Sequence, residues 1–161
     1  MDDGATMPDL AVTLADGTRV RLRDLPRPAV VYFYPKDDTP GCTREAQDFS
    51  ALGDDFAAAG ATVIGISKDP PVTHGKFAKK QALTVALGSD EDGSVCDAFG
   101  VWGEKAMYGR TYMGIERATF LFDAQGLLVQ EWRKVKVPGH AQAVLAAAKA
   151  GGDVTDGRPV R

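Results

Sequence analysis

The sequence predicts an α/β fold with a central mixed β-sheet flanked by helices. An apolar run of β-branched and aromatic residues, 29–34, ends at a proline, and a polar turn and a helical pattern follow it. A second apolar run, 61–67, comes after that helix. Two buried strands joined by a helix form a βαβ unit, whose right-handed crossover makes the strands parallel. The carboxyl ends of both strands then lie at one edge of the sheet, where open α/β sheets bind their ligands.

The other elements follow from local patterns along the chain. An N-terminal β-hairpin is predicted over 10–25, because apolar residues alternate on both sides of the turn Asp16-Gly17. The helix after the first central strand begins at Cys42 and stops at Gly60. The remaining predictions are a helix over 70–83, a strand at 85–87, a helix over 90–99, an irregular segment near the functional site over 101–114, a second hairpin from 117 to 132, and a C-terminal helix over 141–149.

Length and composition narrow the function classes. A chain of 161 residues suits a single domain, predicted over 1–150, with a flexible tail over 151–161. The net charge is −3 and the basic residues form no run, which disfavours nucleic-acid binding. No apolar stretch reaches the length of a membrane span, and the acidic start does not resemble a secretory signal. Two cysteines far apart give no disulfide framework, so a cytoplasmic location is expected.

Cys42 is the residue around which the predicted site forms. It lies where the first central strand passes into a helix, and the first N–H groups of a helix have no partner within it. These groups and the positive end of the helix dipole stabilise a thiolate, so we expect a reactive nucleophile. Gly41 allows a close backbone turn, and Pro40 suits a helix start. A lone cysteine is more often a packing residue, but its position here beside Thr39 and Gly41 favours the nucleophile.

Thr39 precedes Cys42 by three residues, so the turn can fold its hydroxyl back towards the sulfur. A small oxygen-bearing substrate would then meet this hydroxyl and the backbone N–H groups of Gly41 and Cys42. Such preorganised donors make an anion-tolerant pocket. A dithiol oxidoreductase would need Cys-x-x-Cys, whereas this chain has Thr39-x-x-Cys42, which excludes a local disulfide.

The string 33–43, FYPKDDTPGCT, contains the pattern Pro35-x-x-x-Thr39-x-x-Cys42. This pattern resembles the active-site motif of peroxiredoxins, and the full string resembles their bacterioferritin-comigratory-protein, or peroxiredoxin Q, branch. A second segment, 112–123 (YMGIERATFLFD), resembles the family landmark in which an arginine on a strand reaches the cysteine thiolate. The resemblance extends from the first hairpin to the C-terminal helix and implies a thioredoxin-like fold. It also implies that Arg117, otherwise an ordinary surface arginine, is the charge partner of Cys42.

The resemblance implies a peroxidase that acts on hydrogen peroxide and organic hydroperoxides. The Cys42 thiolate attacks the terminal peroxide oxygen, water or an alcohol departs, and a sulfenic acid remains. Arg117, Thr39 and the N–H groups at the helix start stabilise the charge as it moves to the leaving oxygen. Pro35 and Pro40 are expected to shape the walls of the site and limit water. No cofactor is expected, and no metal, because nothing near His74 in the sequence supplies a second ligand.

The sequence departs from this branch in the residues that would reduce the sulfenic acid. Many members carry a resolving cysteine five residues after the nucleophile, where this chain has Gln47, and others carry it on the following helix, where 75–81 contains none. One interpretation is a one-cysteine enzyme, whose sulfenic acid is reduced directly by an external thiol: thioredoxin, glutaredoxin or a low-molecular-weight thiol. The other makes Cys96 an atypical resolving thiol after local unfolding. We favour the first, because a bridge to Cys96 needs both helices to rearrange.

A non-enzymatic alternative is a redox-sensing interaction module, since a fold alone does not fix its function. A sensor needs only a reactive thiol, whereas a peroxidase also needs groups such as Thr39 and Arg117 that stabilise its leaving group. The resemblance to a branch with many monomers predicts a monomer.

Overall fold

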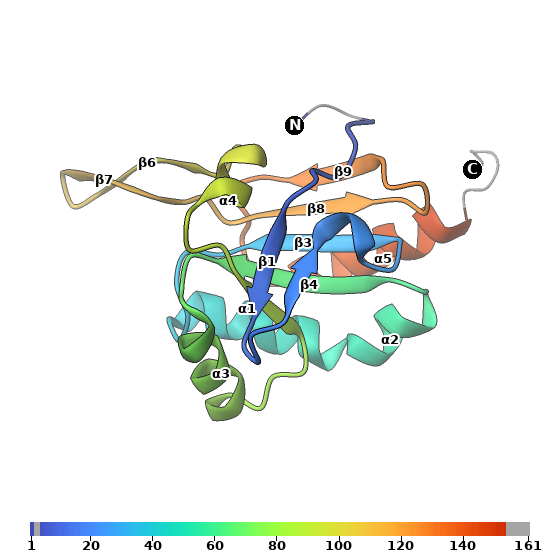
Figure 1. Cartoon of the computed structure of the whole chain (residues 1–161), viewed down its shortest axis with the longest axis horizontal. Helices are drawn as coiled ribbons and strands as arrows, with labels where there is room; N and C mark the ends of the chain where they lie inside the picture. The colour runs from blue at the N-terminus through green and yellow to red at the C-terminus, as the bar shows by residue number, and fades with distance from the viewer. Residues whose placement is uncertain (2–3, 154–161) are drawn as a thin grey trace.

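A seven-stranded mixed sheet forms the centre of the molecule (Figure 1). The structure is a computed structural model that describes Met1 and residues 4–153. The strands of this sheet are β1 (Ala11–Leu14), β2 (Arg19–Arg21), β3 (Ala29–Phe33), β4 (Thr62–Ser67), β5 (Ala86–Ser89), β8 (Ala118–Phe122) and β9 (Leu128–Trp132), in the spatial order β2-β1-β5-β4-β3-β8-β9. The predicted βαβ unit is confirmed, because β3 and β4 are parallel neighbours. Strand β5 pairs parallel with β4, whereas β8 runs antiparallel to β3.

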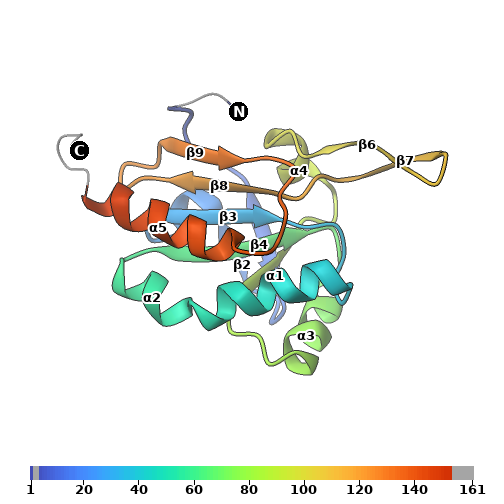
Figure 2. The same ribbon diagram turned by 180° about the vertical axis from the view of Figure 1, so that it is seen from behind.

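Two core layers lie on opposite faces of this sheet. Alternate residues of a strand point to opposite faces, so Val31 and Phe33 of β3 enter one layer and Tyr32 enters the other. The second layer is covered by the helices α1 (Pro40–Ala51), α2 (Gly53–Ala58), α3 (Pro71–Lys80) and α5 (His140–Asp153). Figure 2 shows α1 and α5 passing in front of the sheet. The first layer is covered by α4 (Ser94–Ala98) and by the 3-10 turn (Leu22–Asp24) that follows the N-terminal hairpin.

The hairpin pattern of the second half is also confirmed. Phe120 and Phe122 of β8 belong to the layer beneath α4, and Leu121 belongs to the layer beneath the long helices. The whole of β8 is buried, which explains its unbroken apolar run.

The segment 101–114, predicted to be irregular, is instead a regular hairpin of β6 (Trp102–Met107) and β7 (Arg110–Ile115). It forms a separate two-stranded sheet that extends away from the body of the protein (Figure 1). Its turn residues Tyr108 and Gly109 have φ of 52° and 76°, as a tight hairpin turn requires. The sequence does not reveal these two strands, because most of their residues are at least partly exposed and apolar and polar residues do not alternate along them.

Several predicted boundaries also need correction. The helix of Cys42 begins at Pro40, where a proline suits the first turn, and it is interrupted at Leu52 before α2. Helix α4 is shorter than predicted, because the Asp90 carboxylate accepts hydrogen bonds from the N–H groups of Val95 and Cys96 and so sets its start. Other helices and strands differ from their predicted bounds by a few residues. Helix α3 covers 71–80, and strand β5 covers 86–89.

Helix α5 continues to Asp153, beyond its predicted end at residue 149. The rest of the predicted tail, 154–161, lies outside the described residues, and the assignment of 1–150 to one domain stays a prediction. Within Met1 and residues 4–153, no helix has the length and apolar character needed to cross a membrane.

Candidate active site

Cys42 lies in the first turn of α1. The turn 34–39 joins this helix to the carboxyl end of β3 (Figure 2). Thr39 occupies the N-cap position without a side-chain capping bond, and the first backbone hydrogen bond of the helix runs from the N–H of Thr43 to the carbonyl of Thr39. The N–H groups of Gly41 and Cys42 therefore precede the first intrahelical bond, as the sequence predicts. Only 2% of Cys42 is exposed to solvent. The thiol therefore lies almost entirely beneath the protein surface.

Arg117 reaches this sulfur from the start of β8. Strand β8 pairs antiparallel with β3, and Ala118 lies opposite Phe33, so the residue before β8 comes close to the start of α1. The Nη2 atom of Arg117 donates a hydrogen bond to Cys42 Sγ at 3.4 Å. A Cβ atom at Gly41 would lie 3.1 Å from the same Nη2, so a larger residue there would crowd the guanidinium. The structure thus brings together the two residues that the sequence analysis paired.

Glu45 forms an ion pair with Arg117. The sequence alone did not identify Glu45 as a site residue. Its Oε1 atom lies 2.6 Å from Nη1 of Arg117, and only 1% of its side chain is exposed. Its Oε2 atom has no hydrogen-bond partner among the residues that the structure describes. One signal was available, because an acidic residue three positions after Cys42 lies on the same side of the helix.

Burial and charge act against each other in this pair. Burial raises the pKa of Glu45 to about 7, and attraction to the Arg117 guanidinium opposes the rise. Burial by itself would lower the pKa of Arg117, but the charges of Glu45 and Cys42 outweigh it and raise that pKa. Arg117 therefore stays a cation, shared between one carboxyl group and the sulfur.

The free energy of unfolding of this protein should depend less on pH in the variant Glu45→Gln than in the wild type. The folded pKa of Glu45, about 7, lies above its ordinary value of 4.5, so the folded protein retains a proton that the unfolded chain has lost. This stabilisation is complete below the unfolded pKa and is lost as the pH rises through the folded pKa. At 1.4 kcal/mol per pKa unit, the loss is on the order of 3 kcal/mol.

Urea unfolding of wild type and Glu45→Gln at a series of pH values measures this contribution. The free energy of unfolding of the wild type should fall relative to that of the variant as the pH rises from acid to neutral. Parallel pH profiles for the two proteins would contradict the assignment.

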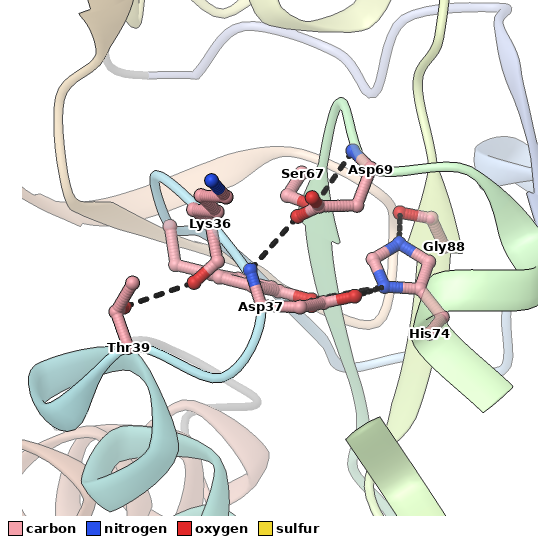
Figure 3. A network of polar contacts seen from close by, with 8 residues as sticks. Lys36, Asp37, Thr39, Ser67, Asp69, His74 and Gly88 are labelled. Atoms are coloured by element: carbon pink, nitrogen blue, oxygen red, sulfur yellow. Dashed lines mark hydrogen bonds and ion pairs between the residues drawn. The ribbon is translucent and has the colours of Figure 1, made fainter. Parts of the chain in front are cut away.

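The Thr39 hydroxyl has a hydrogen-bond partner within the turn before α1. Its Oγ1 atom donates to the carbonyl of Lys36 at 3.0 Å (Figure 3). The proton of this hydroxyl is therefore directed to the backbone, while its position in the turn stays that of the N-cap residue of α1. Pro35 and Pro40, at the two ends of the same turn, are both exposed.

Cys96 lies on the other side of the sheet from Cys42. It is fully buried in the layer beneath α4, whereas Cys42 belongs to the layer beneath the long helices. Burial raises the pKa of the Cys96 thiol, and the neighbouring Asp90 raises it further. Both cysteines are free. The structure does not bring the two sulfurs together.

The structure also gives His74 neighbours that the sequence analysis did not foresee. Potential ligand atoms of Asp37, Asp69 and His74 lie within 4.8 Å of one another. Both ring nitrogens of His74 already face hydrogen-bond acceptors, the Asp37 carboxylate and the carbonyl of Gly88. A metal ion would have to replace these bonds, so the group is better explained as a hydrogen-bond network.

Comparison with known proteins identifies the family. Residues 4–131 match the AhpC/TSA family. The chain belongs to this family. It is 52% identical over 143 residues to a peroxiredoxin Bcp of Xanthomonas campestris, covering 88% of this chain and 89% of that protein.

Solved peroxiredoxins share the same fold. A structure of the bacterioferritin comigratory protein of X. campestris superposes with a TM-score of 0.87 at 48% identity, covering 94% of this chain and all of that one. A mutant of Xylella fastidiosa PrxQ gives a TM-score of 0.88 at 41% identity, covering 95% and 98%. These likenesses confirm the predicted thioredoxin-like fold and the Bcp branch of the peroxiredoxins.

Proposed function

We propose that this peroxiredoxin reduces hydrogen peroxide and organic hydroperoxides at the sulfur of Cys42. Family membership makes the chain a thiol-dependent peroxidase, and the hydrogen bond from Arg117 to Cys42 Sγ is the observation that favours this sulfur. The similar X. campestris protein is described as having alkyl peroxide reduction activity, which supports organic hydroperoxides as substrates.

The chemistry is nucleophilic displacement on oxygen. The Cys42 thiolate attacks the terminal oxygen of the peroxide, a sulfur–oxygen bond forms, and the oxygen–oxygen bond breaks. The sulfur is oxidised to a sulfenic acid, and the leaving oxygen takes a proton and departs as water or an alcohol. Negative charge moves from the sulfur to the leaving oxygen during this step. The Arg117 guanidinium and the N–H groups of Gly41 and Cys42 are the donors that stabilise it.

Thr39 serves this reaction as a hydrogen-bond acceptor. A hydroxyl has one proton to donate, and that of Thr39 is directed to the carbonyl of Lys36. The lone pairs of its oxygen can then accept a hydrogen bond from the O–H of a hydroperoxide, which orients the terminal oxygen towards the sulfur. Pro35 and Pro40 form the exposed rim of the turn through which the substrate approaches.

An external thiol then regenerates the enzyme. The thiol condenses with the sulfenic acid to give a mixed disulfide and water, and a second thiol releases the Cys42 thiol as the new disulfide leaves. The position of Cys96 beyond the sheet supports this one-cysteine route over an internal bridge. Thioredoxin, glutaredoxin and low-molecular-weight thiols are the reductants to test. The monomeric state and the cytoplasmic location stay predictions.

Family membership and the contact of Arg117 with the sulfur favour an enzyme over a redox-sensing module. A stopped-flow measurement of hydrogen peroxide consumption by the fully reduced protein tests this, followed by intact mass under denaturing, thiol-blocked conditions. We expect rapid oxidation and the gain of one oxygen atom, located at Cys42. Slow oxidation would contradict the peroxidase, and a loss of two hydrogens with Cys42 joined to Cys96 would contradict the one-cysteine route.

Cys96→Ala is expected to leave peroxide turnover unchanged with a small external thiol as reductant. The variant removes the only other sulfhydryl group of the chain, so an enzyme that resolves through Cys96 would stop after one turnover. The steady-state rate, measured beside wild type at equal concentration of folded protein, distinguishes the two routes. A burst of one equivalent followed by arrest would show that Cys96 takes part.

A further inference from the structure

A buried polar network lies beneath the turn that carries Thr39 and Cys42. The Tyr34 hydroxyl donates to Asp37 Oδ1 at 2.5 Å, and Asp37 Oδ2 lies 2.6 Å from Nδ1 of His74. The other ring nitrogen of His74, Nε2, lies 3.1 Å from the carbonyl oxygen of Gly88 (Figure 3). Asp37 is 5% exposed and His74 is fully buried. We call the chain of contacts Asp37–His74–Gly88 the clamp.

The partners of His74 fix where its protons lie. A carbonyl oxygen can only accept, so Nε2 carries a proton that it donates to Gly88. A second proton lies between Nδ1 and the Asp37 carboxyl group, because that short contact needs one donor. Each polar atom of the clamp therefore has a partner. A fully satisfied buried network of this kind rigidifies the segments that it joins.

The clamp joins three separate segments at the edge of the sheet where the candidate active site lies. Gly88 belongs to β5, His74 to α3, and Asp37 to the turn between β3 and α1. A second contact holds the same turn, since the N–H of Asp37 donates to Asp69 Oδ2 at 2.9 Å. The Ser67 hydroxyl at the end of β4 donates to that same oxygen at 2.7 Å. Figure 3 shows these anchors on one side of the turn and Thr39 on the other.

The conformation of the turn requires such anchors. Asp38, directly after Asp37, has φ of 61°, in the left-handed region. Non-glycine residues adopt this conformation at a cost on the order of 1 kcal/mol and hold it where their surroundings impose it. Thr39 follows at once, and its hydroxyl bonds to the carbonyl of Lys36 within the same turn. The position of Thr39 and of the first N–H groups of α1 therefore depends on where Asp37 is held.

We propose that His74 is a positioning residue for peroxide reduction, which acts by holding Asp37 and thereby the turn that places Thr39 and the start of α1 around Cys42. The inference rests on the proposed function. His74 does not contact the sulfur in this arrangement; it connects the turn to β5. Loss of the bond to Asp37 should slow the reaction of Cys42 with peroxide without removing the thiol or its arginine.

A pair of substitutions separates the two bonds of His74. The amide nitrogen of asparagine can take the place of Nδ1, and that of glutamine can take the place of Nε2. His74→Asn thus keeps a donor for Asp37, whereas His74→Gln keeps a donor for Gly88 and loses Asp37. The readout is the second-order rate constant of the reduced protein with hydrogen peroxide. We expect His74→Gln to be slower than wild type by about 10- to 100-fold, as misplaced reacting groups cause, and His74→Asn to recover most of the loss.

Phe77→Leu is the control for stability. Phe77 is buried on the same helix, α3, and does not take part in the clamp, so its substitution lowers the melting temperature and should leave the rate constant unchanged. The inference is overturned if His74→Gln reacts as fast as wild type, or if all three variants slow in proportion to their loss of stability. Should His74→Gln not fold, Asp37→Asn carries the same expectation, because it leaves one oxygen for the donors of Tyr34 and His74. A wild-type protein that does not react with peroxide would instead overturn the proposed function.

Discussion

Cys42→Ser is expected to abolish peroxide turnover. A serine hydroxyl at neutral pH is a far weaker nucleophile than a thiolate, and the Arg117 guanidinium that contacts the sulfur cannot make it one. The substitution changes one atom at a site that is 98% buried, so the fold and the network around it should persist. Consumption of hydrogen peroxide should fall to the rate without protein, and intact mass should show no added oxygen.

Cys96→Ala provides the matched control, because it also removes one of the two sulfhydryl groups but leaves Cys42 in place. Circular dichroism and thermal unfolding of both variants would show that each is folded. Turnover by Cys42→Ser at a rate close to that of wild type would refute the proposed chemistry. Oxidation of Cys96 in that variant would indicate that the buried thiol becomes accessible.

The site was predictable from the sequence where its signal is local. The strand at 29–34, the turn and the helix start follow one another along the chain, so periodicity and helix-end chemistry are enough to single out Cys42. Arg117 carried no local signal, because an arginine at a strand start is usually exposed, and only the resemblance to peroxiredoxins paired it with the cysteine. The antiparallel register of β8 with β3 is what brings the two residues together.

Contacts between distant segments explain what the sequence analysis missed. His74 and Asp37 are 37 positions apart, and no pattern in either segment shows that α3 folds beneath the turn. The bond from the Thr39 hydroxyl to the carbonyl of Lys36 is local in sequence, but the residue pattern does not show which acceptor the folded turn offers. Glu45 is nearer to Cys42 in sequence, but its importance appears only when Arg117 lies beside it. Pairings of this kind are set by tertiary structure, which a single sequence does not reveal.

Arg117→Ala is expected to lower the rate constant for peroxide reduction by roughly 100-fold or more, the usual cost of removing a donor that stabilises developing negative charge. The cation both faces the thiolate before the reaction and follows the charge to the leaving oxygen, so its loss weakens each stage. Stopped-flow consumption of hydrogen peroxide by the reduced variant, measured beside wild type, gives this loss.

Arg117→Ala also changes the stability of the protein, and this effect must be separated from its effect on the rate. Without Arg117, the Glu45 side chain is left 1% exposed and without its ion-pair partner, and the attraction that opposes the rise in its pKa is lost. Keeping that carboxyl group charged costs a protein about 3–5 kcal/mol of stability, and this cost applies only above the raised pKa. The double variant Arg117→Ala with Glu45→Gln has no carboxyl group to ionise there, so above that pKa it should be more stable than Arg117→Ala while staying slow. Glu45→Gln alone retains the guanidinium and should react much faster than the double variant. If the double variant recovers both stability and rate, Arg117 acts on Cys42 only by neutralising Glu45, and its proposed role in the displacement step is wrong.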